Sequence, residues 1–204
     1  ILANIKGIKI AYPSNAADFK GLLKAAFYDP NPVIMLEHKG LYWSKVPGTE
    51  DAKTIEPAED YILPFGKGNV VIEADANEIE KGRTLVIVTY GMGVYWAKQA
   101  VKNHPGRVEI IDLRTLIPLD ENLVFERVKI HGKCMVLTEE QINNSFAEAF
   151  AHRISKACFR FLDAPVEAMG SLNLPAVPIN LILEKEMLPN AEKVSEKIRE
   201  MLNH

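Results

Sequence analysis

The chain of 204 residues has no apolar run that approaches the length of a membrane span, and no stretch has the features of a signal peptide. It has only two cysteines, Cys134 and Cys158, and nothing in their positions marks a disulfide pair or a metal site. Both fall in apolar segments, so we expect reduced thiols in the core. These absences make the cytoplasm the expected compartment and exclude a membrane partner.

Clusters of positive charge are missing as well. The net charge is −3 and there is no basic run, which excludes a general affinity for nucleic acid. The five histidines are scattered without the spacing of a zinc site. No serine lies in a nucleophile elbow, and no set of cysteine and histidine for covalent catalysis is visible. The sequence therefore shows no complete catalytic set.

What the sequence does contain is an alternation of strands and helices. Within residues 83–119, an apolar run at 84–89 leads through a glycine-bearing turn into a helix at 94–103, and a second apolar run follows at 108–113. This pattern is typical of a βαβ unit, whose two strands are parallel neighbours.

The same alternation continues to the C-terminus. We expect a helix from Asp120 to Gly132, a strand at 134–138, a helix capped by Ser145, a strand at 166–169 and a final amphipathic helix at 190–202, while prolines interrupt residues 175–189. The pattern predicts a mostly parallel sheet with helices on both faces, an α/β fold.

The N-terminal part contains a second βαβ pattern, with a strand at 7–12, a helix at 16–28 and a strand at 33–37. Residues 38–81 have little helical pattern and one short apolar run at 70–72, which predicts an edge strand and a domain boundary near residue 55. Because the chain opens with Ile1, close to a strand, we expect it to be part of a longer protein.

The turn at Gly91 and Gly93 is a candidate phosphate site, because it lies between a strand and a helix. The dinucleotide-binding fingerprint requires a third glycine where Trp96 stands, although Asp112 lies at the distance of the fingerprint's acidic residue. We favour a structural turn and keep nucleotide binding as the alternative.

Two groups of polar side chains are candidate sites. Glu139 and Glu140 are adjacent on a strand and point apart, which favours a solvated strand end. Asp29 and Asn31 follow the C-terminus of a helix, where free carbonyl groups and the dipole favour a cation. Oxygen ligands of this kind suit a hard cation, and the alternative is an Asx-type helix stop.

Several segments, in order, resemble the beta subunit of the thiamine-diphosphate-dependent 2-oxo acid dehydrogenases, which include the pyruvate, branched-chain 2-oxo acid and acetoin enzymes. They are KGIKIAYPSNAADFKGLLKAAFYDPNPVIMLEHKGLY, TLVIVTYGMGV, VEIIDLRTLIPLD and LEKEMLPNAEKV. The resemblance covers nearly the whole chain, as the C-terminal part of that subunit or of a fused chain.

The resemblance implies two domains. Residues 1–55 would be the end of an α/β pyrimidine-binding domain, 56–80 a linker and 81–204 a transketolase C-terminal-like domain, which is a three-layer αβα sandwich. The family's thiamine-contacting residues lie upstream of Ile1. The resemblance therefore implies that this chain contains no catalytic or cofactor-binding residue, and that thiamine diphosphate and magnesium are bound mostly outside it.

The resemblance also implies a structural potassium ion, as in branched-chain members, with the Ala26 carbonyl, Asp29 and Asn31 as ligands. The implied partners are the alpha subunit or an alpha part of the same chain, a second beta subunit and the lipoyl acyltransferase core. The sequence departs from the family at two loops, where Asn143-Asn144-Ser145 replaces a glycine pair and Asn173-Leu174-Pro175 replaces Asp-Thr-Pro.

The implied activity of the parent protein is oxidative decarboxylation of a 2-oxo acid with acyl transfer to a lipoyl group, and this chain would supply scaffold and interfaces. Two alternatives stay open. The chain is a non-catalytic binding or assembly module, or it is part of another thiamine enzyme of the transketolase group. The side chain of the substrate is not indicated, because its pocket would lie outside this chain.

Overall fold

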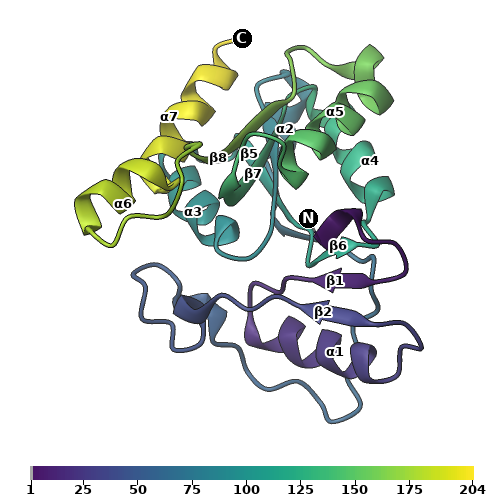
Figure 1. Cartoon of the computed structure of the whole chain (residues 1–204). Helices are drawn as coiled ribbons and strands as arrows, with labels where there is room; N and C mark the ends of the chain where they lie inside the picture. Colours follow the sequence, from purple (N-terminus) through teal and green to yellow (C-terminus); the bar gives the residue numbers. More distant parts are fainter. Residues whose placement is uncertain (1) are drawn as a thin grey trace.

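The structure is a computed structural model that describes residues 2–204. It contains two packed units, each built on its own sheet (Figure 1). The first has three strands in the order β2-β1-β6 with one helix beside them. The second has five strands in the order β3-β5-β4-β7-β8, with helices on both faces.

The first unit consists of β1 (Lys9–Ala11), α1 (Ala16–Phe27), β2 (Val33–Met35) and β6 (Thr115–Ile117). The second unit consists of β3 (Asn69–Ile72), α2 (Ala76–Glu80), β4 (Leu85–Thr89), α3 (Gly93–Ala100), β5 (Val108–Asp112), α4 (Glu121–His131), β7 (Cys134–Gln141), α5 (Phe146–Cys158), β8 (Glu167–Ser171), α6 (Leu181–Met187) and α7 (Ala191–Leu202). Short 3₁₀ turns occur at 2–4, 39–41, 50–52, 101–103 and 159–161.

The first unit confirms the N-terminal βαβ pattern. Strands β1 and β2 are parallel, with Lys9 opposite Val33. Helix α1 begins where expected, because the Asn15 side chain accepts a hydrogen bond from the backbone N–H of Asp18 at 2.9 Å. The sheet has a third strand that the sequence pattern did not indicate. Strand β6 pairs antiparallel with β1, although it lies about a hundred residues downstream.

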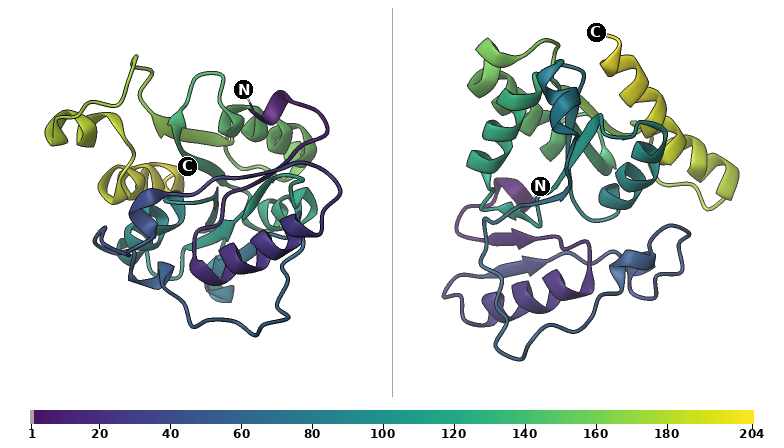
Figure 2. Two further views of the ribbon diagram at one scale, coloured as in Figure 1. Left: turned by 60° about the horizontal axis from the view of Figure 1, so that its bottom comes forward. Right: turned by 180° about the vertical axis from the view of Figure 1, so that it is seen from behind.

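The second unit confirms the expected three-layer αβα sandwich with a mostly parallel sheet. Strand β4 pairs in parallel with β5 and β7, and β7 with β8. Only β3 is antiparallel, and it forms the expected edge strand. Figures 1 and 2 show α3 and α7 on one face of this sheet and α4 and α5 on the other.

Strand β4 explains why the layers pack on both faces. All five of its residues are buried. Val86 and Val88 face the α4–α5 layer, while Leu85 and Ile87 face the α3–α7 layer. A strand buried on both faces has a continuous apolar sequence instead of an alternating one. Each such side chain contributes roughly 1.5–3 kcal/mol when it leaves water.

Two details differ from the expectations, and one short helix is additional. Helix α6 forms within residues 175–189, because Asn180 caps it by accepting from the N–H of Ile182. In α5 the buried face contains Ala147, Phe150 and Ile154, whereas Phe161, which lies at helical spacing from them, falls beyond the end of the helix at Cys158 and is 52% exposed. The division at residues 55 and 80 stays a prediction, and within residues 56–80 a short helix, α2, forms in addition to the expected strand β3.

Cys134 and Cys158 are buried and free, as expected. Among the described residues, no helix is both long and apolar enough to span a bilayer.

Candidate functional site

The place where an open α/β sheet most often binds a ligand is the switch point of its strand order. Here β4 lies between β5 and β7. The chain leaves β4 through α3 on one face and reaches β7 through α4 on the other (Figure 1). The switch point is therefore at the carboxyl ends of β4 and β7, beside the first unit.

Side chains of the protein itself fill this switch point. Thr89 donates from its hydroxyl group to the Leu137 carbonyl at 2.9 Å. The hydroxyl groups of Tyr90 and Thr138 form a hydrogen bond of 2.6 Å. Burial raises the pKa of the Tyr90 phenol, so this group stays protonated at neutral pH. Each buried polar group here has a partner, which leaves none directed at a ligand.

The Gly91–Gly93 turn is filled in the same way. Gly91 has φ +55°, and a Cβ atom on it would lie 2.7 Å from the ring of Tyr12. A Cβ atom on Gly93 would lie 2.1 Å from the hydroxyl oxygen of Thr89, and the Gly93 N–H donates to the Tyr90 carbonyl at 3.1 Å. A phosphate does not fit a turn that packs this closely on its own neighbours. The geometry supports the structural turn over nucleotide binding.

Asp112 also has a role other than ribose binding. It ends β5, fully buried, and its Oδ2 accepts a hydrogen bond of 2.5 Å from the Ser14 hydroxyl group. Its Oδ1 accepts from the backbone N–H of Arg114 at 2.9 Å. Loss of hydration raises the pKa of Asp112 to about 6, although both hydrogen bonds oppose the shift. The carboxyl group thus joins the second unit to the first.

Two further contacts complete this junction. Arg114 donates from Nε to Oδ2 of Asp18 at 2.8 Å, and Tyr95 donates from its hydroxyl group to the Ser14 carbonyl at 2.7 Å. We call Ser14, Asp18, Tyr95, Asp112 and Arg114 the junction cluster. Its polar groups bind one another across the two units, so the cluster fixes their orientation and contains no free nucleophile.

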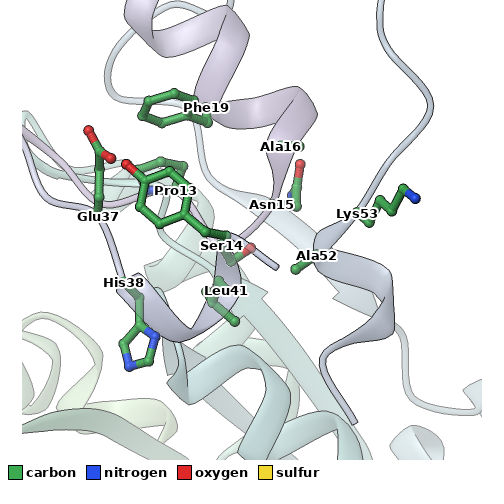
Figure 3. Close-up of a pocket in the computed structure, with 11 residues that line it drawn as sticks. Pro13, Ser14, Asn15, Ala16, Phe19, Glu37, His38, Leu41, Ala52 and Lys53 are labelled. Atoms are coloured by element: carbon green, nitrogen blue, oxygen red, sulfur yellow. The ribbon is translucent and has the colours of Figure 1, made fainter. Parts of the chain in front are cut away.

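A cavity of about 160 Å³ borders the junction cluster. Phe19, Leu41 and Ala52 contribute apolar walls, and Asn15 lies at the start of α1 beside them (Figure 3). His38 lies on the rim with its ring turned away from Phe19 in this view. No pair of titratable groups converges in this cavity within the described chain, so it is not an acid–base centre.

A larger cleft of about 990 Å³ lies between the units. Glu139 and Glu140 line it but act separately. The Glu139 carboxylate lies 3.4 Å from Nε2 of His38, and Glu140 accepts from the backbone N–H of Phe146 at 2.9 Å. Glu140 is exposed. The two carboxylates do not act as a catalytic pair, in agreement with the solvated strand end.

The predicted cation site has a specific geometry. Asp29 pairs through Oδ2 with the Lys9 ammonium group, and its Oδ1 accepts from both the backbone and the side-chain N–H of Asn31, each at 2.9 Å. These bonds lower the pKa of Asp29 to about 2, and the bond from Lys9 contributes more than either of the two from Asn31. The Ala26 carbonyl accepts from the N–H of Asp29 at 3.2 Å. Asp29 and the Ala26 carbonyl therefore have protein partners, and Lys9 supplies the positive charge.

The sequence pattern indicates some members of the junction cluster but not that they lie together. Ser14 and Asp18 lie at the start of the helix expected at 16–28, and Asp112 is the possible nucleotide contact of the sequence. Tyr95 and Arg114 were missed. A carboxylate that ends an apolar strand needs a buried partner, and this is the signal that could have directed attention to Asp112.

Comparisons with known proteins agree with this fold. The family model described as "Transketolase, C-terminal domain" matches residues 74–194. A solved structure named "Split gene transketolase, inactive beta4 tetramer" superposes with a TM-score of 0.71 at 17% identity, over 98% of this chain and 60% of that one. At this identity the likeness shows the fold alone.

Curated relatives are more similar in sequence. The 2-oxoisovalerate dehydrogenase subunit beta of Bacillus subtilis is 36% identical over 98% of this chain. The pyruvate dehydrogenase E1 component subunit beta of Rhizobium meliloti is 34% identical over 97%, and the acetoin:2,6-dichlorophenolindophenol oxidoreductase subunit beta of Cupriavidus necator is 33% identical over 99%. The chain spans 58%, 40% and 56% of their respective lengths. This chain therefore belongs to the transketolase C-terminal domain family, and its relatives include beta subunits of 2-oxo acid dehydrogenases.

Proposed function

We propose that this chain is the C-terminal part of the beta component of a thiamine-diphosphate-dependent 2-oxo acid dehydrogenase. The parent protein would decarboxylate a 2-oxo acid oxidatively and pass the acyl group to a lipoyl arm. The supporting observation is the similarity to such beta subunits along 97–98% of the chain. Within the parent, this chain would orient domains and form interfaces.

The cofactor belongs to other parts of the proposed enzyme. Thiamine diphosphate, held with magnesium, would supply the electron sink for decarboxylation. The glycine turn is the strongest phosphate candidate in the sequence, but Tyr12 and Thr89 occupy the space beside it. The described residues thus do not fit the cofactor, and we assign no step of the reaction to them.

The chain's own task would be to hold the end of the pyrimidine-binding domain against the C-terminal domain through the junction cluster. Its partners would be the alpha subunit or alpha part, a second beta subunit and the lipoyl acyltransferase core. For the isolated chain, an assembly module is the better description, since the buried polar groups at its switch point bind other groups of the protein. A cytoplasmic location stays a prediction.

Potassium binding at Ala26, Asp29 and Asn31 also stays a prediction. The ligand atoms are oxygens that suit a hard cation. In the present geometry they do not form a cage around an ion, because Lys9 already pairs with Asp29. Potassium would have to displace this ammonium group.

A chimera tests the proposal. The matching C-terminal part of the Bacillus subtilis 2-oxoisovalerate dehydrogenase beta subunit would be replaced by this chain and co-purified with its alpha subunit. We expect a stable complex with 2-oxo acid-dependent decarboxylation above that of the alpha subunit alone. A chimera that shows cooperative unfolding but neither assembles nor turns over substrate would contradict the proposal. The unaltered Bacillus pair is the positive control.

A further inference from the structure

The cavity of about 160 Å³ beside the junction cluster has the size of a site for a small molecule. Pro13, Phe19 and Leu41 give it apolar walls. Its volume is below the roughly 300–1,000 Å³ of sites for drug-sized ligands. It corresponds to about five water molecules at roughly 30 Å³ each. The cavity therefore suits one small ligand with a short apolar part.

The walls of this cavity are held in place by the rest of the fold. Leu41 packs against a buried cluster that contains Ala52 and Tyr95. The Gln99 side chain donates to the Pro47 carbonyl at 3.0 Å, which fastens the segment 38–53 to α3. A cavity whose walls are ordered before binding loses less entropy when a ligand enters.

Two charged side chains that line the cavity have no partner of opposite charge. Within residues 2–204, neither Glu37 nor Lys53 forms an ion pair or a side-chain hydrogen bond. The charges beside the cavity walls are instead paired with each other. These pairs are Lys98 with Asp51 at 3.2 Å and Lys20 with Glu56 at 2.8 Å. Glu37 and Lys53 are therefore available to a ligand.

The start of α1 adds hydrogen-bond donors to the same cavity. The N–H of Asp18 donates to the Asn15 side chain, whereas the N–H groups of Ala16 and Ala17 have no acceptor among the described residues. Ala16 lines the cavity. Free N–H groups and the helix dipole favour an anion at this end. The carboxylate of Asp18 does not oppose it strongly, because Arg114 pairs with Asp18.

The two sides of the cavity thus differ in charge. Figure 3 shows Glu37 beside Phe19 on one side, and Lys53 on the opposite side, beyond Asn15. The Lys53 side chain extends outward in this view, but it is exposed and free to turn toward an anion. A ligand that carries an ammonium group, a carboxylate and a short apolar side chain satisfies both sides and the walls. A 2-oxo acid lacks the cation for Glu37, and a simple amine lacks the anion for α1.

We propose that this cavity binds a free α-amino acid with an apolar side chain. The carboxylate of the ligand accepts from the N–H of Ala16, its ammonium group pairs with Glu37, and its side chain packs on Phe19 and Leu41. The occupant contacts both α1 and the segment 38–53, so it stabilises the folded chain when it binds. The proposal needs no step of decarboxylation and is independent of the proposed function.

Calorimetric titration of the 204-residue chain with leucine tests the site. We expect one equivalent to bind with a dissociation constant of about 0.1–1 mM. Two compounds with the same carbon skeleton are the matched ligands. 4-Methyl-2-oxopentanoate lacks the ammonium group and 3-methylbutylamine lacks the carboxylate, and each should bind at least about 10-fold more weakly. No binding of leucine at about 10 mM, or equal affinity for the oxo acid, would overturn the proposal.

Variants assign the contacts. Glu37→Gln keeps the size of the side chain and should raise the dissociation constant of leucine at least about 10-fold. Lys53→Gln should raise it about 2–5-fold, because an exposed ion pair contributes less. The control is Glu59→Gln, which changes an exposed carboxylate that does not line the cavity and should bind leucine normally. An unchanged dissociation constant in Glu37→Gln contradicts the assignment.

A second readout locates the ligand without relying on affinity. In ¹⁵N-labelled protein, leucine should shift the amide resonances of Ala16 and Leu41 and leave those around the Gly91 turn unchanged. Saturable shifts confined to any other part of the chain would place the ligand elsewhere and overturn the proposal. Decarboxylation by the chimera is a separate measurement, so failure of one proposal is distinguishable from failure of the other.

Discussion

Arg114 of the second unit donates from Nε to Asp18 of the first unit at 2.8 Å, and both side chains are largely buried. Asp18 lies in the first turn of α1, where its charge also favours the helix dipole. The contact therefore connects the start of a helix in one sheet layer to the loop after a strand in the other. A buried carboxylate that loses its partner is costly, which makes this pair a sensitive probe of the junction.

Arg114→Ala should lower the free energy of unfolding by about 3 kcal/mol, because Asp18 would remain buried without its cation. Urea unfolding followed by circular dichroism measures the change. Arg153→Ala is the control, since Arg153 and its partner Glu121 are 48% and 38% exposed. That substitution should cost less than about 1 kcal/mol. Equal losses in the two variants would show that the junction pair contributes no more than a surface pair.

Asp112 should make stability fall as the pH rises from about 4 to about 6. Its pKa is about 6 in the folded protein and 3.8 in the unfolded chain, so the folded state binds more protons in this window. Ionising the buried group then costs up to about 3 kcal/mol above pH 6. Asp112→Asn does not titrate and should flatten this part of the profile. Unfolding at a series of pH values would refute the assignment if both proteins had the same slope.

Gly91→Ala should destabilise the protein more than Gly82→Ala does. Both glycines have positive φ, but a Cβ atom at Gly82 meets nothing within 4 Å, whereas one at Gly91 collides with the Tyr12 ring. The backbone strain costs roughly 1–2 kcal/mol in each case, and the collision adds about 1–3 kcal/mol at Gly91 alone. Thermal unfolding of the two variants separates the contributions. Identical losses would mean that Tyr12 moves aside freely.

Potassium should raise the melting temperature relative to tetramethylammonium at equal ionic strength if the Asp29 site binds the ion. Asp29→Ala should abolish this difference, and Asp60→Ala, which removes an exposed carboxylate elsewhere, should keep it. Lys9→Gln should enlarge it, because Lys9 is the group that potassium has to displace. The predicted site would be eliminated if the melting temperature were the same in potassium and in tetramethylammonium for both the unaltered and the Lys9→Gln protein.

The sequence pattern was sufficient for features that depend on nearby residues. Ser145 makes the expected capping bond to a backbone N–H group, and Asn15 and Asp120 cap the starts of two other expected helices in the same way, because a cap and its partner are separated by only three residues. The parallel pairing of β4 with β5 followed from one helix joining two apolar runs.

Features that depend on distant residues could not be predicted. Strand β6 has three residues and precedes Pro118, and its partner β1 is about a hundred residues away, so no local periodicity reveals it. Helix α6 is hidden among prolines and has only one buried residue, Met187, so it lacks an amphipathic pattern. The junction cluster has the same origin, because residues separated by up to 98 positions meet in it.

Because of strand β6, the first sheet is not formed by one continuous stretch of the chain. Residues 115–117 follow β5 of the second unit, yet they complete the sheet that β1 and β2 begin. A genetic exchange that joined a foreign segment at residue 81 would therefore carry a strand of the first sheet along with the second unit. The first sheet is inherited intact only when residues 9–117 stay together, so recombination between relatives should preserve them as one block.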